Sequence, residues 1–66
     1  MKRADLEQRI AKLAADHGAT WEYVGGGDHD KFRLNGKNIM IPRHREIGEG
    51  LARTILKQAR RALGLE

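Results

Sequence analysis

The sequence of 66 residues contains no cysteine, one proline, and a single Trp, Tyr and Phe. The absence of cysteine excludes disulfide bonds, thiolate-ligated metal sites and a cysteine nucleophile. No apolar run approaches the roughly 18–20 residues that a membrane-spanning helix requires. The segment Met1–Leu13 is charged throughout and lacks the apolar core of a signal peptide. These absences predict one small domain, residues 1–66, located in the cytoplasm.

Acidic residues are in the minority. The chain has 13 Lys and Arg against 9 Asp and Glu, a formal net charge of +4 and a pI of about 10.0. An isoelectric point above about 9 is typical of domains that bind a polyanion such as nucleic acid. The alternative is a charged surface that keeps a small protein in solution. Charge alone leaves both possibilities open.

The first predicted element is a helix from about Asp5 to His17. We expect Asp5 to cap its start, with Gln8 completing a capping box. Gly18 suits the left-handed residue that ends many helices. Apolar side chains recur at i, i+4, i+7 and i+8 and form one stripe that faces the core: Leu6, Ile10, Leu13 and Ala14.

A strand is predicted for Thr20–Val24, which is rich in aromatic and β-branched residues and ends at three consecutive glycines. Ordering three glycines costs backbone entropy, so a loop of this kind needs a reason. Either Gly25–Gly27 is a flexible hairpin turn, or it allows a backbone to approach a ligand closely.

Asn35-Gly36 predicts a two-residue turn between the strands Asp30–Leu34 and Lys37–Pro42. The turn pairs Leu34 with Lys37, Phe32 with Ile39, Asp30 with Ile41, and His29 with Pro42. One face is apolar and is expected to join the core: Phe32, Leu34, Ile39 and Ile41. The other face carries His29, Lys31, Arg33, Asn38 and Met40. Half-solvated antiparallel sheets commonly alternate in this way, so the basic face does not by itself establish a function.

After a charged connection over residues 43–48, a second helix is predicted for Glu49–Leu63. Its apolar stripe consists of Leu51, Ile55, Ala59 and Ala62. Its opposite side carries Arg53, Lys57, Arg60 and Arg61. Few acidic residues follow Glu49, so pairing within the helix cannot neutralise these cations. The basic stripe is either a solvated face or part of a polyanion-binding surface.

The predicted order of elements is therefore α-β-β-β-α, an α+β fold. A three-stranded antiparallel sheet with both helices on one face buries the apolar sets and leaves the other sheet face open. This is the arrangement of double-stranded-RNA-binding domains.

Three segments give a more specific signal. Gly27–Phe32 resembles the Gly-Ser-His-x-x-[Phe/Tyr] segment of HicA toxins, and Ile41–His44 resembles their strand end followed by Pro-x-His. Gly50–Ala59, with its Ile-Leu-Lys-Gln run, is similar to their C-terminal helix. A first helix ending in His-Gly and followed by a Trp also fits, so the resemblance covers nearly the whole chain.

This resemblance implies a double-stranded-RNA-binding-like fold, cleavage of mRNA, and inhibition by a cognate HicB antitoxin. The catalytic histidine of the family corresponds to His29. Asp28 stands where the family usually has a serine. Either its carboxylate orients the imidazole or stabilises its charge, or the substitution marks a divergent or inactive member.

The chemistry of RNA cleavage explains why histidine suits this position. RNA supplies its own nucleophile, the 2′-OH, and cleavage needs a base for that proton, an acid for the leaving oxygen, and positive charge near the phosphate. Histidine titrates near neutral pH. His29 follows the glycine loop, and Lys31 and Arg33 share its face. His44 is the candidate for the second proton transfer, the alternative being a loop histidine that caps a helix or pairs with Glu46. His17 is assigned no chemistry.

Seven residues are the candidate RNA contacts: Gly26, Gly27, Lys31, Arg33, Asn38, Arg43 and Lys57. Asp28-His29-Asp30 also raises the hypothesis of a metal site. Alternate residues of a strand point to opposite faces, so only an irregular loop could gather the three side chains. We therefore expect neither a metal nor another cofactor. Two non-enzymatic hypotheses remain: a small RNA- or DNA-binding module that uses the same basic face, and a protein-interaction subunit.

Overall fold

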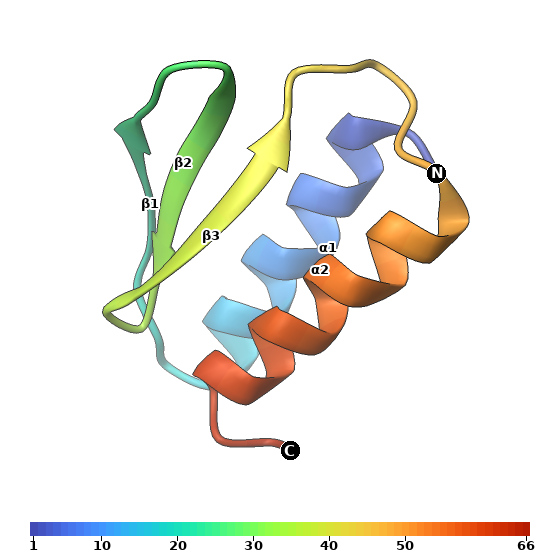
Figure 1. Ribbon diagram of the computed structural model, residues 1–66. Helices are drawn as coiled ribbons and strands as arrows, with labels where there is room; N and C mark the ends of the chain where they lie inside the picture. Colours follow the sequence, from blue (N-terminus) through green and yellow to red (C-terminus); the bar gives the residue numbers. More distant parts are fainter.

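The computed structural model describes residues 1–66 and has the predicted order of elements (Figure 1). These are α1 (Arg3–Asp16), β1 (Trp21–Gly25), β2 (His29–Leu34), β3 (Lys37–Pro42) and α2 (Glu49–Ala62). The strands form one antiparallel sheet in the order β1-β2-β3. The α+β class and the α-β-β-β-α order predicted from the sequence are thus confirmed. Neither helix is long and apolar enough to cross a membrane.

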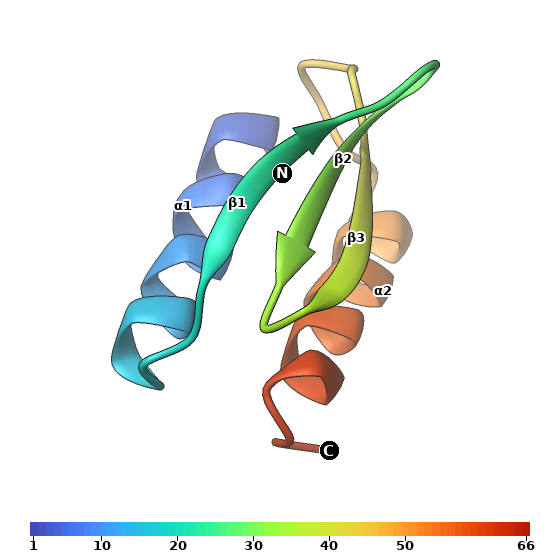
Figure 2. The same cartoon turned by 90° about the vertical axis from the view of Figure 1, so that its left-hand side faces the viewer.

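The two helices lie side by side on one face of the sheet, and α1 and α2 contact each other (Figure 1). Helix α1 also contacts β1, and α2 contacts β3. Figure 2 looks onto the opposite face of the sheet, which no other element covers. The prediction of a two-layer fold with one open sheet face is confirmed.

The β2–β3 hairpin has the predicted register over its whole length, from Leu34 opposite Lys37 to His29 opposite Pro42. Asn35 and Gly36 both have positive φ, 51° and 82°, as a type I′ turn requires. The Asn35 side chain also donates a 2.9 Å hydrogen bond from Nδ2 to the carbonyl of Ala62. That bond ties the turn to the end of α2.

Strand β1 pairs with β2 through Trp21–Leu34 and Tyr23–Phe32, and the register then shifts between Tyr23 and Gly25. The shift is a β-bulge, which places Gly25 opposite Lys31. The ring of Trp21 stacks on that of Phe32 with a centroid distance of 4.5 Å. The strand therefore begins one residue later than predicted and includes the first glycine.

Twelve apolar side chains form the core between the sheet and the helices. They are Leu6, Ile10, Ala14, Phe32, Leu34, Ile39, Ile41, Ile47, Ala52, Ile55, Ala59 and Ala62. The predicted core face of the hairpin is confirmed. The prediction for one residue of the α2 stripe was wrong, because Leu51 is 45% exposed and Ala52 is buried instead. Ile47, from the connection before α2, supplies a large buried side chain beside the small alanines.

The start of α1 differs from the prediction. The helix begins at Arg3, its N-cap is Lys2, and no side chain caps it, so the Asp5 capping box is wrong. The reason lies in long-range bonding, because the amide of Arg3 donates a 2.8 Å hydrogen bond to the carbonyl of Arg45. Asp5 lies in the first turn instead, where a carboxylate interacts favourably with the helix dipole. At the other end Gly18 has a φ of 64°, as predicted for the stop.

Candidate active site and nucleic-acid interface

The open face of the sheet carries the polar side chains that parity predicted. His29, Arg33, Asn38 and Met40 are exposed and Lys31 is half-buried. Cross-strand partners share a face, so Glu22 of β1 lies beside Arg33 on this surface. The structure therefore brings His29, Lys31, Arg33 and Asn38 together on one cationic surface, with Glu22 beside it on β1.

His29 is the first residue of β2, and its side chain is exposed. Among the three histidines of the sequence, only His17 makes a side-chain hydrogen bond, from Nδ1 to the carbonyl of Leu13 at 2.8 Å. That bond accounts for His17 as a helix-end residue. The imidazole of His29 has both nitrogens free for a ligand, and Asp28 is exposed without a bond to it.

The glycine loop is shaped by its own backbone. A Cβ at Gly26 would lie 2.2 Å from the carbonyl oxygen of His29, and Gly25 has a φ of 90°. A Cβ at Gly27 would meet nothing within 4 Å. Gly25 and Gly26 are thus required by the bulge and by close contact of the loop with His29, whereas Gly27 is not. The sequence left two explanations open, a flexible hairpin turn or close approach to a ligand, and the close approach seen at Gly26 is to the chain's own backbone.

Asp30, the residue after His29, was not among the predicted site residues. Its carboxylate faces the helical side and is buried. Oδ1 accepts hydrogen bonds from Arg43 Nε at 2.9 Å and from Tyr23 Oη at 3.3 Å, and Oδ2 accepts one from Arg3 Nη2. The predicted register already placed Asp30 on the core face, and a buried carboxylate requires partners. That was the signal available in the sequence.

Charge pairing decides the protonation of Asp30. Burial of the carboxyl acts to raise its pKa, but the hydrogen bonds and charges of Arg43 and Arg3 outweigh this effect. They hold the pKa of Asp30 below its ordinary value. The side chain is therefore an anion at neutral pH, and it joins α1, β1, β2 and the start of the β3–α2 connection.

Arg43 turns toward this carboxylate rather than onto the open face. Its Nε bonds Asp30, and its Nη2 donates to the carbonyl of Gly26 at 3.4 Å. The side chain remains 52% exposed. Arg43 thus links the glycine loop to the carboxylate that follows His29.

His44 lies in the connection between β3 and α2, exposed and without a side-chain hydrogen bond or ion pair. Neither structural alternative for it is present. The N-cap of α2 is Gly48, and Glu46 pairs with the Met1 ammonium at 3.5 Å. Because His29 is opposite Pro42 in the register, both histidines belong to the same end of the sheet.

Lys57 is the predicted contact that the structure separates from the others. It is exposed on α2, which belongs to the helical layer on the covered side of the sheet. On that helix Arg60 is engaged by Glu66, with 2.6 Å between Nε and Oε2. The basic stripe of α2 and the open sheet face are therefore two surfaces.

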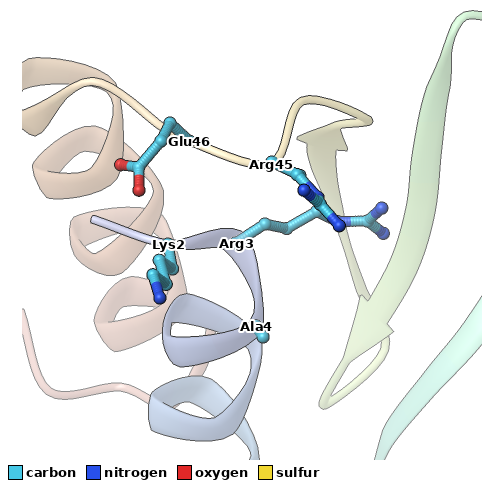
Figure 3. Close-up of a pocket in the computed structure, with 5 residues that line it drawn as sticks. All are labelled: Lys2, Arg3, Ala4, Arg45 and Glu46. Carbon is cyan, nitrogen blue, oxygen red and sulfur yellow. The ribbon is translucent and has the colours of Figure 1, made fainter.

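A pocket of about 620 Å³ lies between the start of α1 and the β3–α2 connection. It is lined by Lys2, Arg3, Ala4, Arg45 and Glu46. Figure 3 shows the side chains of Arg3 and Arg45 next to each other, with the Arg3 guanidinium directed toward the sheet. Arg3 thus lines the pocket and reaches Asp30, while its own Nε is buried without an acceptor. Sequence reasoning had not singled out either arginine.

The side chains of Asp28, His29 and Asp30 do not converge. Asp30 lies on the helical side of β2 and His29 on the open side, as alternation along a strand requires. No group of three or more His, Asp or Glu side chains in the chain is arranged to hold a metal ion.

Comparison with known proteins identifies relatives of this chain. The family described as the HicA toxin of bacterial toxin-antitoxin systems matches residues 8–60. A probable mRNA interferase HicA from Pseudomonas fluorescens is 50% identical over 37 residues, which make up 53% of this chain and 62% of the relative. The chain thus aligns with less than two thirds of that relative's length. No solved structure gives a significant match.

Proposed function

The chain belongs to the HicA toxin family, and from this we propose that it is an endoribonuclease toxin that cleaves mRNA with His29 as its leading catalytic residue. The observation that carries the proposal is the free, exposed imidazole of His29 at the edge of the open cationic face. The relative from Pseudomonas fluorescens is named a probable mRNA interferase, which supports the choice of substrate.

His29 acts in the first step as the general base. It takes the proton of a ribose 2′-OH, whose oxygen attacks the adjacent phosphorus. Lys31 and Arg33 lie on the same face and stabilise the negative charge that develops on the phosphorane oxygens. The bond from phosphorus to the 5′-oxygen then breaks and leaves a 2′,3′-cyclic phosphate. The mechanism requires no metal ion.

The departing 5′-oxygen needs a proton, and His44 is the group we assign to supply it. Its side chain is exposed and makes no competing bond, and it belongs to the same end of the sheet as His29. A pair of imidazoles, one neutral and one protonated, provides both proton transfers near neutral pH. Asp28 makes no contact with His29 and is given no part in the chemistry.

The substrate contacts follow from the open face. Lys31, Arg33 and Asn38 line the path of the RNA across the sheet. Gly26 lets the loop pack against the backbone of His29, and neither this packing nor the path of the RNA requires Gly27. Single-stranded RNA is the substrate we expect, because its phosphates can follow a flat cationic surface. Lys57 belongs to α2, which lies in the helical layer, and is not needed for this path.

We further propose that a HicB-like antitoxin neutralises the toxin by covering the His29 face. That face is cationic, so the antitoxin surface that contacts it should be acidic.

Cleavage of a fluorescent single-stranded RNA by the purified protein in the presence of EDTA tests the proposal. We expect the wild type to cleave in chelator, and His29→Ala to bind the RNA without cleaving it. His17→Ala is the matched control and should cleave normally, because His17 bonds only its own helix. If both wild type and His29→Ala bind RNA and neither cleaves, the protein is a binding module. Activity that EDTA abolishes would contradict the metal-free mechanism.

A further inference from the structure

Two charged residues that flank the proposed catalytic histidines are bonded to each other. Asp30 directly follows His29, Arg43 directly precedes His44, and Arg43 Nε donates to Asp30 Oδ1 at 2.9 Å. We propose that this ion pair is a clamp that fixes the positions of both histidines, so that Asp30 and Arg43 are positioning residues of the reaction. The inference rests on the proposed function for its kinetic consequence, but the clamp itself can be measured without cleavage.

Strand β2 is held in place through its second residue, Asp30. The carboxylate of Asp30 is buried and accepts bonds from three other elements: Arg3 of α1, Tyr23 of β1 and Arg43 of the connection. A carboxylate held by two guanidinium groups in a buried setting has little freedom. The backbone at the start of β2, including that of His29, is held with it.

The glycine loop is held by the same arginine. The other end of the Arg43 guanidinium donates to the carbonyl of Gly26 at 3.4 Å. Gly26 in turn lies against the carbonyl of His29, so closely that even one added carbon would overlap it. Since the imidazole of His29 makes no bond of its own, its direction depends on this backbone packing. Arg43 thereby supports the loop that supports His29.

His44, like His29, makes no side-chain bond of its own. The residue before it is anchored through the Arg43 side chain, and the residue after it through the carbonyl of Arg45, which accepts a 2.8 Å bond from the Arg3 amide. His44 is therefore held on both sides. Arg3 contributes to both anchors, because its guanidinium also bonds Asp30.

A clamp and a substrate contact make different kinetic predictions for Arg43. A residue that only contacts RNA phosphate raises KM and weakens the salt dependence of binding when it is replaced. A positioning residue lowers kcat and leaves KM nearly unchanged. The guanidinium of Arg43 already bonds Asp30 and Gly26. We therefore assign Arg43 the positioning role in place of the RNA contact expected from the sequence.

The experiment uses Asp30→Asn, Arg43→Gln, the double variant and Arg43→Lys in the full chain, with two measurements. Steady-state cleavage over a range of RNA concentrations should show kcat lowered about 10- to 100-fold, with KM within about threefold of wild type. The double variant should be about as slow as either single variant, because one interaction is lost in all three. Arg43→Lys keeps the charge but not the planar fork, so it should be about as slow as Arg43→Gln, with KM and salt dependence close to those of wild type.

The second measurement is backbone NMR relaxation, which needs no activity. Amides of Gly26, Gly27 and His44 should show lower order parameters in the Asp30→Asn and Arg43→Gln variants than in wild type. Glu66→Gln, which removes another arginine–carboxylate contact at the far end of the chain, is the matched control and should change neither result. Arg43 is half-exposed, so Arg43→Gln remains informative even where Asp30→Asn does not fold.

Unchanged order parameters in Arg43→Gln would overturn the clamp. So would a loss of kcat that only mirrors a smaller folded fraction at the assay temperature, measured by circular dichroism, or losses that add in the double variant. If the wild type does not cleave RNA, the proposed function fails, while the relaxation data still decide whether the ion pair holds the loop and the connection.

Discussion

Arg43 Nε lies 2.9 Å from Asp30 Oδ1, which joins the residue before His44 to the residue after His29. Neither histidine has a hydrogen bond of its own, so the chain holds two free imidazoles by bonding their neighbours. In the proposed mechanism, this arrangement leaves the ring nitrogens available for proton transfer while the backbone beneath them is held by the ion pair. It also explains why a charged residue is buried on the core face of a sheet whose other inward side chains are apolar.

His44 and His29 should differ in their response to the leaving group. We expect His44→Ala to lower kcat on ordinary RNA about 100-fold or more, because an alkoxide must then leave without a proton. On a ribonucleotide 3′-ester of 4-nitrophenol, whose anion leaves without a proton, His44→Ala should cleave nearly as fast as wild type. His29→Ala should remain slow on both substrates. Equal defects of His44→Ala on the two esters would remove His44 from the role of general acid.

Gly26 and Gly27 are adjacent glycines with opposite expectations. Gly26→Ala forces the backbone to move, because the new Cβ would lie 2.2 Å from the His29 carbonyl oxygen. We expect it to destabilise the fold by about 1–3 kcal/mol and to lower cleavage further by displacing His29. Gly27→Ala meets no atom within 4 Å and should change little. Urea unfolding and cleavage assays on the pair decide this. Similar unfolding free energies and cleavage rates for the two variants would show that the packing of Gly26 does not influence the position of His29.

The charge on Asp30 should make the stability of the folded protein depend on pH. Burial opposes the charged form, but Arg43 and Arg3 lower the pKa of Asp30 below its ordinary value of 3.8. A group whose pKa is lowered on folding stabilises the protein fully above its unfolded pKa, and this stabilisation is lost as pH falls through the folded value. The stability difference between wild type and Asp30→Asn should therefore be largest near neutral pH and shrink below about pH 4.

Chemical denaturation of both proteins at a series of pH values measures that difference. Glu66→Gln serves as the control for a carboxylate on the surface whose pKa is lowered chiefly by its hydrogen bond from Arg60. A difference between wild type and Asp30→Asn that does not change between pH 7 and pH 3 would contradict the pairing described for Asp30.

The local parts of the fold were predictable because their causes are local. Asn35-Gly36 fixes the hairpin turn, and the turn fixes which side chains face the core and which face solvent. Errors arose where distant residues decide. The start of α1 follows a bond between Arg3 and Arg45, which the Asp5 capping pattern could not reveal. In α2 the buried side chain is Ala52, in line with Ile55, Ala59 and Ala62, while the larger Leu51 is 45% exposed, so hydrophobicity alone misplaced this position.

The candidate site likewise has one part that local sequence pattern predicts and another part that distant residues decide. His29, Lys31 and Arg33 were placed on one face by alternation alone, and the structure agrees. The two arginine partners of Asp30 come from positions 27 residues before it and 13 after it in the chain. No periodicity links such positions, so only the folded chain shows that Arg43 bonds Asp30.

The open sheet face should govern RNA affinity, and the α2 stripe should not. In a His29→Ala background, which prevents cleavage, Lys31→Gln and Arg33→Gln should each weaken binding of single-stranded RNA. Each should also reduce the slope of log affinity against log salt by about 0.7, the share of one phosphate contact. Lys57→Gln is the matched control with the same charge change on the other layer, and its slope should equal that of the parent. A larger loss at Lys57 than at Lys31 would mean that the RNA binds across the helices. The proposed role of His29 would then have to be abandoned, because its imidazole opens onto the opposite side of the sheet.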